Sequence, residues 1–326
     1  MRLCFSQTGD PSAVLHLDPY EPPAPKGREV VVKMLYAPIN PADFNFIDGT
    51  YGKQPSLPAV PGTEGCGTVE AVGPEVEALT PGDSVIPLHS IGSWSQYVLT
   101  TENHLAKLPP GLDPVQASML RINPATAWQM LHVYRDLKPG EFVVQNAANS
   151  GVGRCVIQIA KHLGWRTLNL VRRAELHEEL TTLGAEYVLL DDDNAPDLAR
   201  SLAQNAPIPL ALNGVGGDSA LRLMDILSPG GAHITFGAMS RRSLKVPNKF
   251  LIFKGIDLHG YWVTRWMESA SRHAIHEVLH PLAEMVRDGS LVQPVESIVP
   301  LTSFPDALAA AKKDRRSGKV VLKMEA

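Results

Sequence analysis

Short apolar runs recur along this chain, but the spacing between them changes near residue 114. Before it, apolar runs such as 30–35 and 68–72 are separated by proline- and glycine-rich turns, a pattern typical of a β-rich domain. After it, short apolar runs alternate with stretches of helical periodicity. These patterns predict helices over 174–183, 196–204 and 217–227, and strands over 142–144, 167–171, 186–190, 208–213, 231–236 and 256–263.

Strands that alternate with helices indicate an α/β fold with a doubly wound parallel sheet covered on both faces. The end of the chain departs from this pattern, with predicted helices over 272–288 and 304–312 and strands near 295–299 and 319–323. We therefore expect two domains, because the end of the chain returns to the β-rich one. The β-rich domain is expected to comprise 1–113 and 267–326, and the nucleotide-binding domain 114–266.

Residues 142–171 read as strand, small-residue turn, helix, strand, which is the βαβ pattern of dinucleotide-binding sites. The turn Ala148-Asn-Ser-Gly-Val-Gly153 has Ala and Ser where the G-x-G-x-x-G pattern has its first two glycines. An ordinary helix-entry turn would explain this turn equally well if it stood alone. As a dinucleotide site, the turn would place five residues under a pyrophosphate at the helix N-terminus: Asn149, Ser150, Gly151, Val152 and Gly153.

The second strand of this unit ends in Arg172 and Arg173, where a site for NAD would carry an acidic residue. A carboxylate would repel a 2′-phosphate, whereas a guanidinium binds one through charge-assisted hydrogen bonds. The pair therefore predicts NADPH as the cofactor. The alternative is that the two arginines begin a solvated loop.

Composition excludes several classes of protein. A formal net charge of −4 over 326 residues is unlike a nucleic-acid-binding or membrane-surface protein. The three cysteines are far apart, so neither a disulfide framework nor a zinc cluster of cysteines is indicated. We found no apolar stretch long enough to span a bilayer and no targeting segment, so a cytoplasmic location is expected, although a mature organellar protein would have the same composition.

Several motifs along almost the whole chain resemble those of the medium-chain dehydrogenase/reductase superfamily. Within it, the chain resembles the zinc-free branch, and most closely the trans-2-enoyl-CoA/ACP reductases known from mitochondrial fatty-acid synthesis. The resemblance implies a Rossmann domain, a GroES-like domain, and reduction of the C=C bond of 2-enoyl thioesters. The motifs that carry it are Ala37–Asp43, Gly49–Gly52, Leu57–Gly65, Asn123–Ala127, Asn146–Gly153, Phe236–Met239, Leu251–Lys254 and the run Gly260–Trp266, which we expect to continue the last strand.

No metal site is expected. Asp43 and Thr63 stand where the alcohol-dehydrogenase branch has a Cys and a His, and they do not make an N/S-rich site for zinc. The segment His276-Glu-Val-Leu-His280 fits the H-E-x-x-H zinc motif, but Pro281 biases His280 away from helical geometry. We interpret this segment as a solvated helix face.

The resemblance implies that Tyr51 is the catalytic residue. Hydride addition to the β-carbon of an enoyl thioester leaves an enolate whose α-carbon needs a proton, and a protonated phenol can donate one. The alternative for Tyr51 is an aromatic residue packed over a neighbouring loop.

The resemblance also implies further contacts with the cofactor. Asn123 and Phe236, Gly237, Ala238 and Met239 would lie near the nicotinamide and its ribose, and Lys319 near a phosphate. Tyr261, Trp262 and Val263 would contact the cofactor and line the acyl pocket, although the aromatic side chains could equally be sheet packing.

Three functions remain open from the sequence. The leading one is NADPH-dependent reduction of 2-enoyl thioesters, and the nearest alternative is a zinc-free NADPH:quinone or α,β-enone oxidoreductase. A non-catalytic NADPH-binding protein is the third. A homodimer joined through the edges of the nucleotide-domain sheets is expected by fold analogy. The basic loop of Arg241, Arg242, Lys245 and Lys249 would suit the phosphate of CoA or of an acyl-carrier protein, or be merely solvated.

Overall fold

The computed structural model describes residues 1–325, which form two compact units. The first unit joins Met1–Ile122 with the chain from Met267 onward, and the second is Asn123–Trp266. Residues 114–122, which we had expected in the nucleotide-binding domain, belong to the first unit. The Nε atom of Arg121 donates a hydrogen bond to the Leu88 carbonyl at 3.0 Å, and the Ile122 amide donates one to Glu64 at 2.9 Å, so this segment is attached to the β-rich unit.

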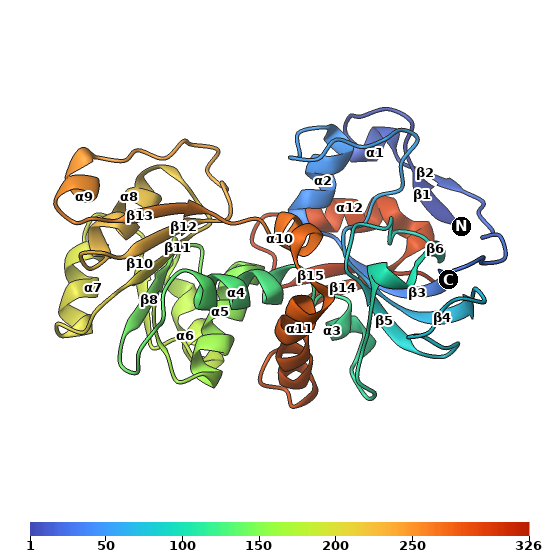
Figure 1. Ribbon diagram of the computed structural model, residues 1–326. Helices are drawn as coiled ribbons and strands as arrows, with labels where there is room; N and C mark the ends of the chain where they lie inside the picture. The colour runs from blue at the N-terminus through green and yellow to red at the C-terminus, as the bar shows by residue number, and fades with distance from the viewer. Residues whose placement is uncertain (326) are drawn as a thin grey trace. The chain divides into compact units, whose positions relative to one another are not determined.

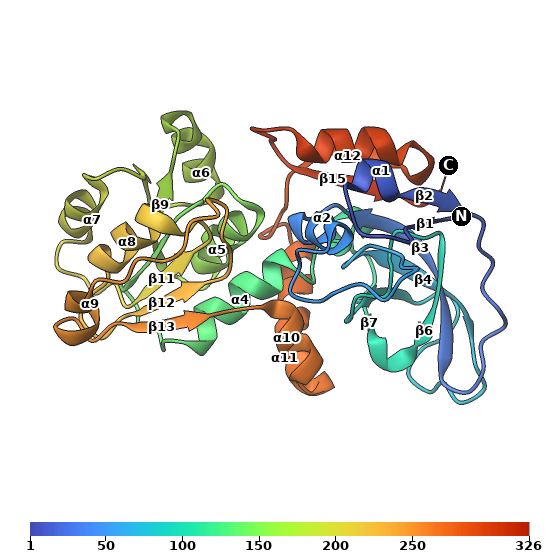
Figure 2. The ribbon, with the colours of Figure 1, turned by 90° about the horizontal axis from the view of Figure 1, so that it is seen from above.

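The second unit contains a parallel sheet in the strand order β10-β9-β8-β11-β12-β13 (Figures 1 and 2). This is the doubly wound dinucleotide-binding order, in which the direction of winding reverses between the first and fourth strands, here β8 and β11. The inner strands β8, β9, β11 and β12 are largely buried because helices cover both faces of the sheet, whereas the edge strand β13 is exposed. Their bounds are β8 Phe142–Gln145, β9 Arg166–Val171, β10 Tyr187–Leu190, β11 Leu210–Asn213, β12 Ala232–Thr235 and β13 Asp257–Gly260.

Helices α4, α5 and α6 pack side by side against this sheet, and α7 packs against α8 (Figure 1). Helix α5 stops where the sequence predicted, since Gly164 follows it in the left-handed conformation with φ of 73°. The helix bounds are α4 Asn123–Val133, α5 Gly151–His162, η2 Ala174–Leu176, α6 His177–Leu183, α7 Ala195–Ala203, α8 Gly217–Ile226 and α9 Asn248–Ile252; α10, Val263–Ser269, begins in this unit and ends in the other.

The strand expected over 256–263 is shorter than predicted. β13 ends at Gly260, and Val263 already begins α10. The apolar and aromatic run 261–263 reads as strand by composition, but only Tyr261 continues the ladder, with its amide donating to the Thr235 carbonyl at 2.9 Å. Trp262 therefore lies in a strand-to-helix connection and not in the sheet.

The first unit is built on a seven-stranded sheet that combines strands β3 to β7 with β14 and β15 from the later part of the chain. The strand order is β14-β15-β3-β4-β5-β7, with β6 paired to β3, and only β14 and β15 run parallel. β15 lies antiparallel to β3, with Val321 opposite Pro38. The strand bounds are β3 Glu29–Pro38, β4 Cys66–Val72, β5 Ser84–Pro87, β6 Tyr97–Thr101, β7 Leu105–Lys107, β14 Val295–Pro300 and β15 Lys319–Lys323, and a separate pair is formed by β1 Arg2–Cys4 and β2 His16–Asp18.

Short helices connect the strands of this unit. The longest helix, α11, runs from Arg272 to Arg287 and passes through Pro281 without ending, so the expected loss of helical geometry at His280 was wrong. Pro281 cannot donate a backbone hydrogen bond within the helix. Burial of the neighbouring side chains of Val278, Leu279 and Leu282 stabilises the helix and offsets the loss of that bond. The other helices are α1 Pro11–Val14, α2 Pro41–Asp48, η1 Glu102–His104, α3 Pro114–Ala117, η3 Leu301–Ser303 and α12 Phe304–Lys312.

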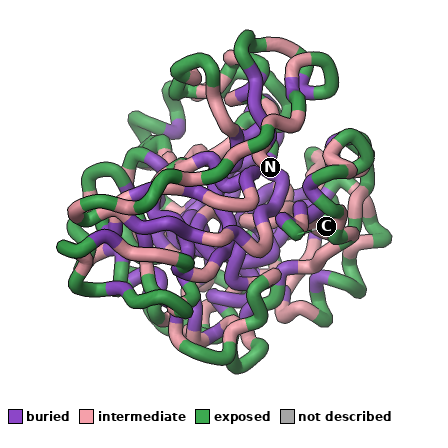
Figure 3. Tube along the Cα trace, turned by 90° about the vertical axis from the view of Figure 1, so that its right-hand side faces the viewer, coloured by how far each residue is buried: buried purple, intermediate pink, exposed green. Residues whose placement is uncertain are grey.

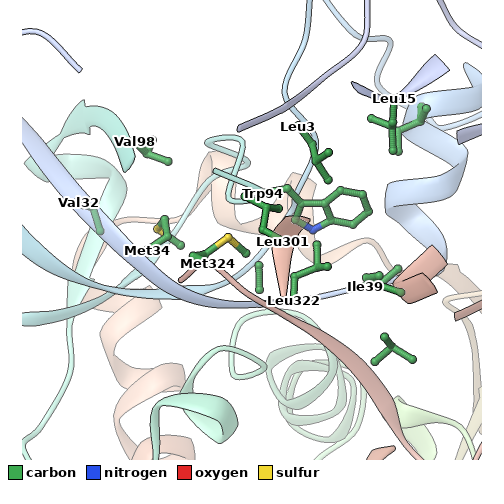
Figure 4. Close-up of a cluster of buried hydrophobic side chains, with 14 of the residues drawn as sticks. Leu3, Leu15, Val32, Met34, Ile39, Trp94, Val98, Leu301, Leu322 and Met324 are labelled. Carbon is green, nitrogen blue, oxygen red and sulfur yellow. The ribbon is translucent and has the colours of Figure 1, made fainter. Parts of the chain in front are cut away.

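The core of the first unit joins residues from the two ends of the chain. Figure 4 shows Trp94 among Leu3, Leu301 and Leu322, all of them at most 1% exposed. Burial of a side chain of this size removes roughly 150–250 Å² from water. In Figure 3 the buried segments run through the interior of the view, and the exposed ones are mainly connections at its edge.

The core of the second unit contains a buried histidine, His233 on β12. Its ring is fully buried, and neither ring nitrogen has a hydrogen-bond partner among residues 1–325. Burial lowers the pKa of His233 from 6.5 to about 4, because the charged ring would lose its hydration. The folded protein therefore holds this imidazole neutral.

His233 is expected to make the folded state sensitive to acid. Below pH 6.5 the unfolded chain binds a proton at this residue and the folded chain does not, so the stabilisation falls as the pH drops toward about 4. Between pH 7 and pH 5 this loss amounts to about 2 kcal/mol. Urea unfolding of the wild type and His233→Leu at both pH values measures it: the wild type should lose about 2 kcal/mol more than the variant. Equal losses would contradict the assignment, and the exposed His16→Leu is the matched control.

Candidate active site

The turn after β8 is held in a shape that does not need the two missing glycines. Ala147 adopts the left-handed conformation with φ of 46°, and Ala148 is buried beneath the turn. Ser150 is extended and caps α5, with its hydroxyl oxygen accepting the Gly153 amide at 3.1 Å. Serine at this position contributes a helix cap that glycine could not.

Glycine is required at the two positions where the sequence keeps it. A Cβ atom on Gly151 would lie 2.4 Å from Nδ2 of Asn123, and one on Gly153 would lie 2.6 Å from the Ala148 carbonyl oxygen. The structure thus brings Asn123, at the start of α4, against the turn. The backbone of the turn is left open to approach by a ligand, and the N-terminus of a 12-residue helix adds a favourable field for an anion.

Four buried polar residues that we did not predict as site residues support this turn. The side-chain amide of Gln145 donates to the Gly153 carbonyl at 3.0 Å and so fixes the start of α5. The side-chain NH₂ group of Asn146 donates to the side-chain oxygens of Asn213 and Ser219, both at 2.8 Å. Its side-chain oxygen accepts the backbone amide of Gly214 at 2.8 Å. This network joins the carboxyl ends of β8 and β11, where the winding reverses. A signal was present in the sequence, since a polar residue follows each of these apolar strands at the same place.

The segment expected near the nicotinamide lies along the β11 end of this network. The Phe236 amide donates to the Asn213 carbonyl at 3.0 Å, and the Met239 amide donates to the Gly214 carbonyl at 3.0 Å. At Gly237, a Cβ atom would lie 3.0 Å from the Gly214 oxygen. Residues 236–239 therefore form a backbone wall at the same edge of the sheet, and Met239 is 61% exposed on it.

Arg172 and Arg173 follow β9 directly, as predicted. Arg172 is exposed and Arg173 half-buried. Within residues 1–325 neither guanidinium group forms a hydrogen bond or an ion pair, although the Arg173 backbone carbonyl accepts the Leu176 amide at 3.4 Å. Beside them Val171, Ala174 and His177 line a mostly apolar hollow of about 300 Å³ together with 188–190. A cationic pair next to an apolar hollow suits an adenosine whose ribose carries a phosphate.

Tyr51 lies in the first unit, on the loop that follows α2. Gly49 ends this helix in the left-handed conformation with φ of 83°, and the Tyr51 amide donates to the Asn45 carbonyl at 2.9 Å. The side chain is half-buried. The loop is therefore attached to the last turn of α2.

The positions that could have carried zinc ligands are occupied by a buried hydrogen-bonded cluster. Asp43 is fully buried, and its two oxygens accept the amides of Asn40 at 2.8 Å and Thr63 at 3.0 Å. Burial outweighs these bonds and raises the pKa of the Asp43 carboxyl to about 6. Burial also raises the pKa of Glu64, whose oxygens accept bonds from the Asn40 amide group at 2.8 Å and from the Ile122 amide.

Lys319 and Arg121 balance this cluster. The Lys319 ammonium donates to the Asn40 side-chain oxygen, and the Arg121 guanidinium donates to the carbonyls of Thr63 and Leu88. Burial lowers the pKa of Arg121 to about 10, while the charge of Glu64 opposes this shift. The placement of Lys319 near a cofactor phosphate stays a prediction.

Across residues 1–325, no group of three or more His, Cys, Asp or Glu side chains could hold a metal ion. The H-E-x-x-H segment lies on α11 with His276, Glu277 and His280 all exposed. Within residues 1–325 no helix has the length and apolar character needed to cross a membrane.

The sheet order and the glycine turn define a dehydrogenase/reductase with a dinucleotide-binding domain beside a β-rich domain. Two family models match the chain: the alcohol dehydrogenase GroES-like domain over residues 26–110 and the zinc-binding dehydrogenase over residues 183–322. The chain is 40% identical to the mitochondrial enoyl-acyl-carrier-protein reductases of Rattus norvegicus and Homo sapiens, over 99% of its own length and 88% of theirs. The chain belongs to the medium-chain dehydrogenase/reductase superfamily, in the family of these enoyl reductases.

Solved structures agree with this assignment. The 2-enoyl thioester reductase heterodimer Etr1p/Etr2p of Candida tropicalis superposes with a TM-score of 0.91 at 28% identity, covering 99% of both chains. The complex of Etr1p with NADP and crotonyl-CoA superposes with a TM-score of 0.90 at 27% identity and the same coverage. A protein described as a putative NADPH:quinone reductase of Bacillus thuringiensis also reaches 0.91 at 28% identity, covering 99% of this chain and 98% of its own, so the fold alone does not separate the two activities.

Proposed function

We propose that this protein reduces the C=C bond of 2-enoyl thioesters with NADPH. The observation that carries the proposal is the 40% identity over 99% of the chain to enoyl-acyl-carrier-protein reductases. The open β8–α5 turn and the Tyr51 loop are the local features expected of such an enzyme. The solved structures do not separate the two activities, because those of quinone reductases are 26–28% identical to the chain and those of Etr1p 27–28%.

The residues of the second unit fit NADPH. The turn offers the α5 N-terminus and the close backbone approach at Gly151 and Gly153 to a pyrophosphate. Arg172 and Arg173 offer donors to a 2′-phosphate. When bound, this cofactor supplies the hydride that adds to the β-carbon of the substrate.

Tyr51 supplies the second half of the reduction. Hydride addition leaves the electron pair delocalised over the α-carbon and the thioester oxygen as an enolate. The Tyr51 hydroxyl donates its proton to the α-carbon, and the phenolate takes a proton back from solvent. The other candidate role for this side chain, packing over a neighbouring loop, needs no hydroxyl.

Turnover of two substrates tests the proposal. We expect oxidation of NADPH with crotonyl-CoA and little with 1,4-naphthoquinone. Faster turnover of the quinone would favour the oxidoreductase alternative. Binding of NADPH without turnover of either compound would favour a non-catalytic protein.

A homodimer is the proposed assembly. β13 is an edge strand whose four residues are all exposed, and Ile252 and Phe253 beside it are 69% and 82% exposed. An unpaired edge next to apolar side chains favours pairing with a second copy. In sedimentation velocity, Phe253→Asp should shift the protein toward monomer, whereas Leu198→Asp on α7 should not. A Phe253→Asp protein that stays dimeric would contradict this interface.

The acyl-carrier protein and the cellular compartment belong to the proposal as well. Residues 226–256 contain five lysines and arginines and no acidic residue, and Arg241, Arg242, Lys245 and Lys249 are exposed. Such a segment suits an acidic carrier or a CoA phosphate. The relatives are named mitochondrial, which favours that compartment over the expected cytoplasm; fractionation of the source cells distinguishes the two.

A further inference from the structure

The loop of residues 49–54 carries Tyr51 but buries little apolar surface. Gly52, Lys53 and Gln54 are exposed, and Tyr51 itself is half-buried. A segment of this kind takes its order from polar contacts, because few apolar contacts oppose its local opening. The contacts that hold the loop therefore decide how well the phenol is presented.

One side chain, Gln54, closes the loop on itself. Its Nε2 group donates to the carbonyl of Gly49 at 2.9 Å and to the carbonyl of Tyr51 at 3.2 Å. These two carbonyls flank Thr50, so the single amide draws both ends of the turn together. Because the Tyr51 amide already donates to Asn45 at 2.9 Å, both backbone polar groups of the tyrosine are engaged.

A second contact attaches the same loop to a distant part of the chain. The Lys53 ammonium lies 2.8 Å from the carboxylate of Glu268, near the end of α10 and within the same unit. The two side chains are 60% and 42% exposed, so solvent weakens the ion pair. Of Lys53 and Gln54, only Gln54 contacts the backbone of Tyr51 directly.

We propose that Gln54 is a positioning residue for the reduction: its amide fixes the backbone of Tyr51 and thereby the direction in which the hydroxyl is presented to the substrate. This inference rests on the proposed function. It depends on donor chemistry, because both partners of the amide are carbonyl oxygens. Alanine removes the donor, and glutamate keeps the size of the side chain but places an acceptor against two acceptors.

Steady-state kinetics with crotonyl-CoA and NADPH tests the proposal. Gln54→Ala and Gln54→Glu should each lower kcat about tenfold, the order expected for two modest hydrogen bonds. The Kd for NADPH and the Tm should stay unchanged. Gln7→Ala, at an exposed glutamine of the same unit, is the matched control. A Gln54→Glu enzyme as active as the wild type would overturn the donor role.

A double-mutant cycle separates positioning from a merely structural role. If Gln54 acts through the Tyr51 hydroxyl, Gln54→Ala should cost nothing further in a Tyr51→Phe background. A tenfold loss in both backgrounds would overturn the proposal. A wild-type protein that turns over no enoyl thioester overturns the proposed function and the positioning role with it, whereas unchanged kcat in the Gln54 variants of an active enzyme overturns the positioning role alone.

Discussion

Tyr51→Phe is expected to lower kcat for crotonyl-CoA by about 10²- to 10⁴-fold, the range that a positioned proton donor contributes. The ring of phenylalanine keeps the packing of tyrosine and lacks only the hydroxyl group that carries the proton. The loop should keep its shape, because in the variant the backbone amide of residue 51 still donates to Asn45 and its carbonyl still accepts from Gln54. The Kd for NADPH is expected to stay the same.

Single-turnover measurements at saturating NADPH check this expectation most directly. Tyr20→Phe is the matched control, since Arg2 lies 4.4 Å from the centre of the Tyr20 ring and a phenylalanine ring preserves that contact. A Tyr51→Phe enzyme with the wild-type rate would remove this residue from the chemistry. The packing role would then be the correct one.

The double variant Arg172→Ala/Arg173→Ala is expected to raise the KM for NADPH about 10- to 100-fold and to leave the KM for NADH nearly unchanged. Each guanidinium can make charge-assisted hydrogen bonds to the 2′-phosphate, and NADH has no group at that position. Neither guanidinium group has another partner among the residues that the structure describes, so their removal should not destabilise the fold. The preference for NADPH over NADH would therefore fall by the same factor.

Initial rates with both cofactors measure this preference. Arg272→Ala/Arg287→Ala on α11 removes the same charge and serves as the control for a general electrostatic effect. Equal losses with NADPH and NADH, or equal losses in both double variants, would show that the 2′-phosphate is not bound by Arg172 and Arg173.

The elements that could be predicted from the sequence are those that depend on local pattern. The alternation of apolar runs and helical stretches predicted the α/β class, and β15 and α12 have the predicted bounds. Gly151 and Gly153 could be selected from the sequence as parts of the turn, because small residues between a strand and a helix let the backbone approach a ligand. The strand over 256–263 and the break at Pro281 were wrong because, in each case, a local preference was overridden by packing.

The supporting contacts of the site could not be predicted, because they join residues far apart in the chain. Asn146 and Asn213 are 67 residues apart and meet only once β8 and β11 are neighbours in the sheet. Glu64 and Ile122 are similarly brought together by the fold. The polar residues at the ends of β8 and β11 mark these positions in the sequence, but they do not identify which residue each one will contact.

The pairing of β15 with β3 has a consequence for the order in which the chain can be assembled. The central strand β3 is made early in synthesis, but its neighbour β15 is made nearly last. The nucleotide-binding unit, Asn123–Trp266, is continuous in the chain and can fold while the β-rich unit still waits for its final strands. During that interval the side of β3 that will receive β15 is an open sheet edge, so the nascent protein is most exposed to edge-to-edge association before β15 emerges.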